Sequence, residues 1–260
     1  MQDKHWFLNR CDLFGRLRAD QLARLETHCR LAEFPRGTLI YLPSDAGECC
    51  FLLAVGRVRI YNVTPDGKQS ILAFMEPGDL FGELAIFEAS RRDEFAEAAE
   101  KTRIVLIPGE VIRSLATDNA ALSFGITKLI GLRRRRIERR LRGLLFRSNR
   151  QRLIHLLLEL AEQFGCQTGR GVQIAFKLSH HELASVIGST RESVTLLLGE
   201  LQQEGSIQIA RRRIELVQRE QLAKEIEFSP LVAGPVPVHG APSGAMTQLG
   251  AAARSVRAEL

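Results

Sequence analysis

The segment 180–199 is the feature that most restricts the fold of this chain. Its sequence, HHELASVIGSTRESVTLLLG, places two short stretches with helical apolar spacing on either side of Gly188-Ser189. Two helices that cross steeply over a short turn need a small residue at the crossing, a residue that tolerates positive φ at the turn, and a cap on the second helix. Ala184, Gly188 and either Ser189 or Thr190 meet these needs. We predict a helix-turn-helix with helices over 179–187 and 190–204, whose shared core is formed by Leu183, Ile187, Val194 and Leu197.

The flanks of this motif predict a nucleic-acid-binding module. A run with strand alternation (172–178) precedes it, and two short strands (206–210 and 213–217) follow around a basic turn. The second helix of such a pair enters the major groove by its N-terminal end, where Arg suits guanine and Glu accepts from cytosine. An ion pair between Arg191 and Glu192 on the surface is the alternative. We expect base contacts from Thr190, Arg191, Glu192 and Thr195, and contacts with the DNA backbone from Ser179, Ser189, Arg211 and Arg212.

The region from 37 to 108 shows the spacing of an antiparallel β-structure. Short apolar runs are separated by turn residues, among them Pro65-Asp66-Gly67 and Pro77-Gly78-Asp79. These turns supply a preset φ, a side-chain acceptor and tolerance of positive φ, and so favour a sandwich or a roll. Before this region, residues 6–30 show helical spacing. The predicted strands are Thr38–Leu42, Cys50–Val55, Arg57–Val63, Ser70–Met75 and Ile104–Ile107.

A long helix is predicted between these two regions, with one apolar seam and a block of arginines. The seam repeats at three- and four-residue steps, and either the chain's own roll or a second copy would cover it. Its length, about 25 residues, favours a homodimer. Residues 131–152 hold ten Arg and one Glu in a chain of net charge +6, so this block is either a solvated helix face or a surface that faces nucleic acid. The predicted dimer contacts are Leu122, Ile126, Leu129, Arg133, Ile137 and Leu141.

Composition and spacing exclude several classes of protein. No apolar run approaches the roughly 20 residues of a transmembrane helix, and the N-terminal residues show no apolar export signal. The five cysteines form no CxxC pair, so we expect neither a disulfide framework nor a metal site. Such cysteine usage fits a protein of the reducing cytoplasm. No nucleophile–base pair or Walker loop indicates an enzyme. From residue 229 onward the chain is rich in Pro, Gly and Ala, and we predict disorder there.

Two motifs, in their order and spacing, resemble the Crp/Fnr family of bacterial regulators, of the catabolite activator type. They are Pro77–Ala85 (PGDLFGELA) and Ile187–Val194 (IGSTRESV), and the resemblance covers roughly residues 8–226. It implies an α+β protein with a cyclic-nucleotide-binding-type β-roll over 1–117, a dimerisation helix over 118–147, a winged helix-turn-helix over 148–228 and a tail over 229–260. Such proteins are similar in being cytoplasmic homodimers that bind two-fold symmetric DNA sites and contact RNA polymerase.

The resemblance also indicates which effector to expect. In members that respond to cyclic AMP, the Glu of the Gly-Glu-Leu turn holds the ribose and a following Arg-Ser or Arg-Thr holds the phosphate. Glu83 matches the first, but counting back from Lys101-Thr102 places the pair on Glu94-Phe95. The polar pair of the long helix falls on Ile137 and Glu138, so cyclic AMP is not expected and no cofactor is assigned. Candidates for an effector pocket are Phe81, Gly82, Glu83, Leu84, Ala85, Arg91, Arg92 and Ile137.

Other sensing chemistry finds little support in these residues. An iron–sulfur cluster needs grouped cysteines, whereas Cys11 and Cys29 lie far apart in the sequence, and no histidine is placed to favour haem. Two functions remain at this point. The first is a sequence-specific DNA-binding transcription regulator. The second is a ligand-binding interaction subunit that uses the β-roll to regulate another protein.

Overall fold

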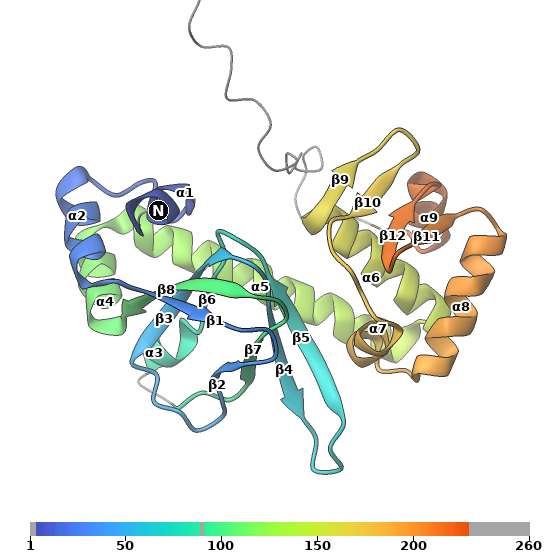
Figure 1. Cartoon of the computed structure of the whole chain (residues 1–260), viewed down its shortest axis with the longest axis horizontal. Helices are drawn as coiled ribbons and strands as arrows, with labels where there is room; N and C mark the ends of the chain where they lie inside the picture. The colour runs from blue at the N-terminus through green and yellow to red at the C-terminus, as the bar shows by residue number, and fades with distance from the viewer. Residues whose placement is uncertain (1–3, 89–90, 229–260) are drawn as a thin grey trace, which may run out of the picture. The chain divides into compact units, whose positions relative to one another are not determined.

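The computed structural model describes residues 4–88 and 91–228, so the predicted tail lies outside the described residues (Figure 1). The chain divides into two units. One holds the residues up to 156 together with 179–198, and the other holds 157–178 and the residues from 199 onward. The first contains the β-structure, the long helix and most of the helix-turn-helix, and the second contains a smaller sheet. The architecture is the predicted α+β class.

Two four-stranded antiparallel sheets form the β-roll of the first unit. The five predicted strands are confirmed, whereas three others were missed because they are short or partly polar and are defined by their pairing partners. The missed strands are β1, β6 and β7. The sheets are β1 (Arg30–Phe34), β8 (Thr102–Pro108), β3 (Cys49–Val55) and β6 (Leu80–Phe81), and β2 (Leu39–Tyr41), β7 (Phe95–Ala98), β4 (Val58–Val63) and β5 (Gln69–Met75).

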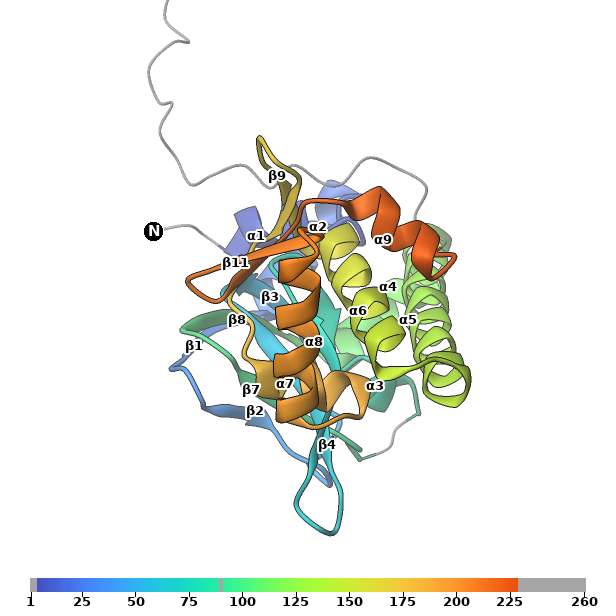
Figure 2. The same cartoon turned by 90° about the vertical axis from the view of Figure 1, so that its right-hand side faces the viewer.

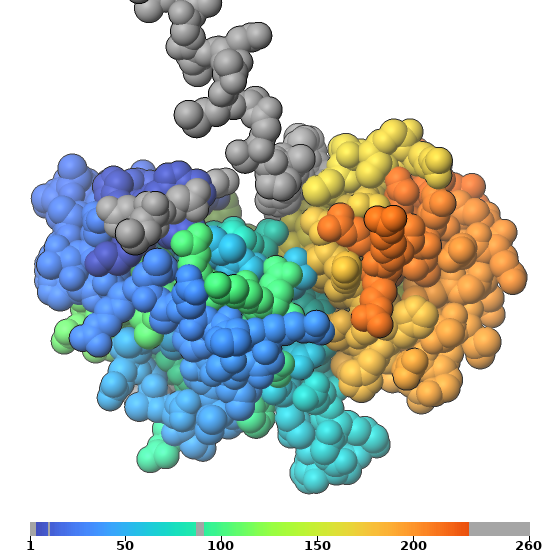
Figure 3. Space-filling view, viewed as in Figure 1, coloured from blue at the N-terminus to red at the C-terminus, as the bar shows by residue number. Residues whose placement is uncertain are grey.

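The predicted turn at Pro65-Asp66-Gly67 joins β4 and β5. Gly67 adopts φ +81°, and the Asp66 carboxylate accepts from the Thr64 hydroxyl at 2.5 Å. The hairpin projects as a distinct lobe in the space-filling view (Figure 3). Between the sheets, the rings of Tyr41, Phe51 and Phe81 stack at centroid distances of 5.3 to 6.3 Å.

The N-terminal region is two helices rather than the one expected over 6–30. Helix α1 (Lys4–Arg10) and helix α2 (Ala19–His28) are separated by turns around Gly15. Helical spacing does not reveal such a break, because the apolar residues of both helices pack into the same core. This core contains Phe7, Phe14, Leu25, Cys50, Ile112 and Leu122.

Three further helices follow the roll. The short α3 (Leu84–Glu88) comes directly after the Gly82-Glu83 turn, and α4 (Gly109–Asp118) is separated from the long α5 (Ala120–Phe146) by Asn119. The Asn119 side chain caps α5, because its oxygen accepts from the Leu122 N–H at 3.1 Å. Helix α6 (Asn149–Phe164) follows α5 after two intervening residues. Its Arg152 donates to the carbonyls of Gly143, Leu144 and Arg147, and so occupies the free acceptors at the end of α5.

The helix-turn-helix forms as predicted (Figure 2). Helix α7 (His180–Ile187) ends at Gly188, which adopts φ +64°, and α8 (Arg191–Gln203) follows. Ala184 is buried at the crossing, and Leu183, Ile187 and Val194 are buried as expected. The fourth core residue is Leu198 rather than Leu197, because position 198 lies one helical turn beyond Val194.

The second unit contains an antiparallel sheet in the order β11-β12-β10-β9. Its predicted hairpin is confirmed as β11 (Ile207–Ala210) and β12 (Arg213–Leu216). Strand β10 (Val172–Ile174) is shorter than the predicted 172–178, although the Ala175 N–H still donates to the Phe164 carbonyl, next to β9. Strand β9 (Gly165–Gln167) and helix α9 (Arg219–Glu225) were not predicted.

Candidate DNA interface and effector site

The N-terminal end of α8 exposes the predicted base-reading residues. Arg191 and Glu192 lie in its first turn and are exposed, and no ion pair joins them within the described part of the chain. Thr190 is exposed, but its oxygen accepts from the Ser193 N–H at 3.2 Å and its proton goes to the Ser193 hydroxyl. Thr190 is therefore the cap of α8, whereas the side chains of Arg191 and Glu192 make no hydrogen bond or ion pair with the other described residues.

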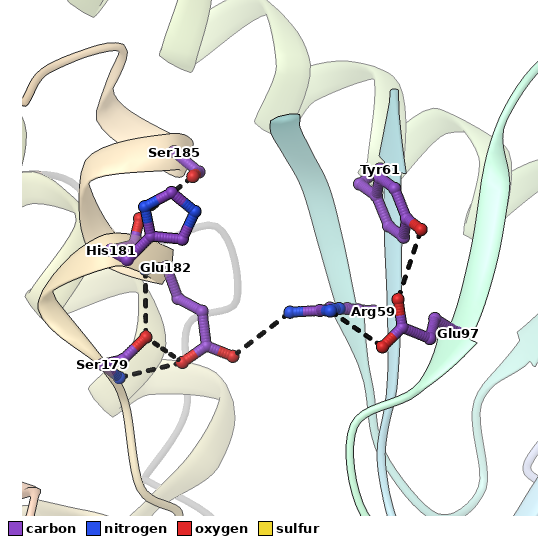
Figure 4. Close-up of polar contacts among 7 residues, drawn as sticks. All are labelled: Arg59, Tyr61, Glu97, Ser179, His181, Glu182 and Ser185. Carbon is purple, nitrogen blue, oxygen red and sulfur yellow. Dashed lines mark hydrogen bonds and ion pairs between the residues drawn. The ribbon is translucent and has the colours of Figure 1, made fainter. Parts of the chain in front are cut away.

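The N-terminal end of α7 is closed by a capping box (Figure 4). Ser179 donates its hydroxyl proton to the Glu182 carboxylate at 2.6 Å, and its oxygen accepts from the Glu182 N–H at 3.2 Å. A hydroxyl has one proton, so Ser179 has none left to donate to a phosphate in this arrangement. Its main-chain N–H also donates to Glu182, at 2.8 Å, so Ser179 offers no free donor for the predicted contact with the DNA backbone.

The capping carboxylate also reaches a strand of the roll (Figure 4). The second oxygen of Glu182 lies 3.9 Å from Arg59 Nη1 on β4, while Arg59 Nη2 donates to Glu97 at 2.8 Å. The Tyr61 hydroxyl donates to the other oxygen of Glu97 at 3.2 Å. A chain of polar contacts thus runs from β4 and β7 to the start of the first helix of the helix-turn-helix.

The hairpin tip between β11 and β12 consists of Arg211 and Arg212. Both residues have positive φ, +51° and +64°, which identifies a two-residue primed turn. Asn and Gly are the usual residues there, because other side chains are strained in this conformation. The hairpin tip therefore holds two positively charged side chains on a strained backbone.

Two arginines of the same chain bond to the Gly-Glu-Leu turn of the roll. Glu83 is only 2% exposed, and its carboxylate accepts from Arg133 Nη1 on α5 at 2.6 Å. Arg133 Nη2 donates to the Leu80 carbonyl and contacts Met75 Sδ at 3.7 Å. The predicted dimer contact Arg133 is therefore a partner of the predicted effector residue Glu83.

Arg92 lies against the same turn. Its Nη1 donates to the Gly82 carbonyl at 3.2 Å, its Nη2 donates to the Cys49 carbonyl at 2.5 Å, and its guanidinium lies 4.2 Å from the centre of the Tyr41 ring. Gly82 adopts φ +70°, which other residues adopt only with strain, and a Cβ there would also displace the Arg92 guanidinium. Among the other pocket candidates, Phe81 and Ala85 are buried, while Leu84, Arg91 and Ile137 are exposed.

Glu94 and Phe95 contact side chains of β2 and β4. The Glu94 carboxylate accepts from the Tyr41 hydroxyl at 2.9 Å, and the Phe95 ring stacks on Tyr61 at 5.2 Å, so neither residue bonds to the Gly82-Glu83 turn. Arg92 takes the place that the resemblance gives to the phosphate-binding arginine, and the residue after it is Asp93.

The arginine block is divided between a helix face that meets the roll and a solvated face. Arg133, Arg136 and Arg140 recur on one face of α5, and that face meets the roll. Arg140 donates to the Leu72 carbonyl of β5, and the charge of Arg136 acts on Glu76 and Asp79. Burial, together with the charge of Asp79, raises the pKa of Glu76 to about 8, against the opposing effect of Arg57 and Arg136. Only part of the block is solvated, including the exposed Arg134 and Arg135.

The predicted dimer seam is divided between the chain's own core and the surface. Leu122 and Ile126 are 1% and 5% exposed, and Leu129 packs beside them, because α1, α2 and α4 already cover this part of α5. Leu122 and Ile126 are therefore not available to a second copy, which corrects that part of the prediction, whereas Leu129 is only partly buried. Ile137 and Leu141 remain 59% and 55% exposed, and Leu144 and Leu145 continue their stripe.

Comparison with known proteins assigns a family to each of the two domains. Residues 31–119 match the cyclic nucleotide-binding domain family, and residues 151–225 match the Crp-like helix-turn-helix domain family. The chain is 29% identical to the CRP-like cAMP-activated global transcriptional regulator of Mycobacterium tuberculosis, over 84% of this chain and 97% of that one. It is 32% identical to the global nitrogen regulator of Synechococcus elongatus, over 71% of this chain and 84% of that one.

A solved structure shows the same fold. The CRP-family transcriptional regulator TTHB099 of Thermus thermophilus superposes with a TM-score of 0.63 at 28% identity, over 80% of this chain and 99% of that one. No helix among the described residues is long and apolar enough to cross a membrane. From its two matched domains, its helix-turn-helix geometry and these relatives, the chain belongs to the Crp/Fnr family of DNA-binding transcription regulators.

Proposed function

We propose that this regulator acts in the cytoplasm as a homodimer on a two-fold symmetric DNA site, in contact with RNA polymerase. The observation that carries the DNA reading is the first turn of α8, where Arg191 and Glu192 are exposed and unengaged. In each half-site, these two residues would read a G·C-containing step. Arg191 would bond to guanine O6 and N7, and Glu192 would accept from cytosine N4. The alternative, an interaction subunit without DNA recognition, leaves this helix end without a role.

Replacing Arg191 with alanine tests the base contact. Removing one bidentate pair of hydrogen bonds should cost about 1–3 kcal/mol and relax the preference at a single base pair. Binding selection on random DNA, performed with the wild type and Arg191→Ala, measures both. Selection of the same consensus with the same stringency by both proteins would show that Arg191 does not read a base.

The hairpin tip offers a change with opposite effects on stability and binding. Arg211→Asn with Arg212→Gly should stabilise the fold by about 1 kcal/mol, because both residues tolerate positive φ. The same variant should bind all DNA sequences more weakly, with a salt slope lower by about 1 for each phosphate that the arginines no longer neutralise. Thermal unfolding and binding at several salt concentrations check the two effects. An unchanged salt slope would remove the hairpin tip from the proposed interface.

We further propose that cyclic AMP is not the effector. Glu83, which would hold a ribose, is already bonded to Arg133. Two donors of Arg92 are bound to main-chain carbonyls, and the next residue, Asp93, offers a carboxylate where a hydroxyl is needed. On α5, Ile137 and Glu138 replace the polar pair of responsive members. A cyclic phosphate placed here would meet an acidic side chain and compete with an existing ion pair.

Calorimetry with cyclic AMP tests this directly. We expect no binding at micromolar concentrations and no change in DNA affinity. The variant Asp93→Ser removes the repelling carboxylate and restores a hydroxyl, so any residual affinity should rise in it. Micromolar binding by the wild type, accompanied by a change in DNA affinity, would overturn this part of the proposal.

A further inference from the structure

Thr195 presents less hydrogen-bonding capacity to DNA than its sequence position indicates. It is exposed on α8, one turn after Arg191, and its hydroxyl lies 2.8 Å from the Arg191 carbonyl, to which it donates. His180 Nδ1, at the start of α7, lies 2.7 Å from the same oxygen. Because the hydroxyl has a single proton, which goes to the Arg191 carbonyl, His180 must be the donor in the second bond.

These two bonds determine what Thr195 offers. Its only proton and one of its two lone pairs are engaged inside the helix-turn-helix, so it has no donor for a base. The same bonds fix its side-chain rotamer and with it the direction of the methyl group. The next residue, Leu196, is 69% exposed although it is a large apolar residue. The methyl of Thr195 and the side chain of Leu196 together make an apolar site beside the two polar residues.

We propose that His180 is a positioning residue for DNA recognition, which turns Thr195 from a hydrogen-bonding residue into a methyl contact. The group that fits such an apolar site in the major groove is the C5 methyl of thymine, which other bases lack. His180 acts through Thr195 and need not touch the base itself. This inference rests on the proposed function, because it assumes that α8 enters the major groove.

The experiment starts from the site obtained by binding selection and replaces each thymine of a half-site with uracil, one at a time. Uracil lacks the methyl and keeps every hydrogen-bonding group. At the thymine read by Thr195 and Leu196, wild type should lose about fourfold in affinity per half-site, which corresponds to one buried methyl-sized group. If no thymine shows such a loss, the inference is overturned while the DNA-binding function stands. If no consensus is selected at all, the proposed function itself fails.

Substitutions at Thr195 separate its methyl from its hydroxyl. Thr195→Val keeps a methyl and removes the hydroxyl, so it should retain the thymine preference and the uracil penalty. Thr195→Ser keeps the hydroxyl and removes the methyl, so it should reduce both. The reverse result, with Ser retaining and Val losing the preference, would show that the hydroxyl reads the base and would overturn the inference.

Substitutions at His180 test its positioning role. His180→Asn places an amide donor near the former Nδ1 and should preserve the uracil penalty, whereas His180→Gln and His180→Ala should reduce it and broaden the selection at that base pair. His181→Ala, at the exposed neighbouring position, is the matched control and should match the wild type. Equal behaviour of the Asn and Gln variants, or a wild-type penalty in His180→Ala, would show that the Nδ1 bond does not set this contact.

Discussion

Arg133→Ala is expected to destabilise the protein by about 3–5 kcal/mol, because it leaves the buried carboxylate of Glu83 without its partner. Glu83 is only 2% exposed, and its Oε1 accepts a hydrogen bond from Arg133 Nη1 at 2.6 Å. The change would also remove the bond from α5 to the Leu80 carbonyl. Urea unfolding of wild type and variant, compared at the same pH and salt concentration, measures the difference in the free energy of unfolding.

Two further variants make this test specific. Arg135→Ala removes an exposed arginine two residues along α5, and it should change the free energy of unfolding by less than about 0.5 kcal/mol. Glu83→Met combined with Arg133→Met removes both charges and should recover most of the lost stability. Equal costs for Arg133→Ala and Arg135→Ala would mean that the ion pair contributes nothing to the fold.

The second large effect is expected from changes that break the proposed homodimer, whose interface we place on the second half of α5. The side chains of Ile137 and Leu141 are exposed in one copy, and they line a stripe with Leu144 and Leu145 that a partner helix would cover. Ile137→Asp with Leu141→Asp should give a folded monomer, because neither residue belongs to the chain's own core. A monomer engages only one half-site, so DNA binding should weaken by roughly 10²–10⁴-fold.

Light scattering and DNA titration check this prediction. Phe124→Asp is the matched control. Phe124 is exposed on the same helix, but it lies about 140° around the axis from Ile137 and should leave the dimer intact. A wild-type mass for the double variant would exclude this stripe as the interface. Monomers from both changes would instead indicate a broader interface along α5.

Much of the helix-turn-helix and of the roll was predictable from local patterns. Ala184 and Gly188 are required by the crossing and the turn of two helices, whatever the rest of the chain does. Pro65-Asp66-Gly67 likewise specifies a turn, and the apolar runs beside it form β4 and β5. Strand β7, by contrast, has little local preference for extended structure, and only its neighbours β2 and β4 define it.

The sequence by itself determined the helix-turn-helix, the turn between β4 and β5, and the residues at the N-terminal end of α8, because short-range spacing and turn chemistry are local properties. The tertiary structure alone decided which partners the side chains meet. An apolar seam is equally satisfied by the chain's own core or by a second copy, so only the packing shows that Leu122 and Ile126 are already covered. In the same way, the pairing of Arg133 with Glu83 and the placement of Arg92 beside Gly82 depend on contacts between residues far apart in the chain. The spacing of residues along the sequence does not encode such contacts.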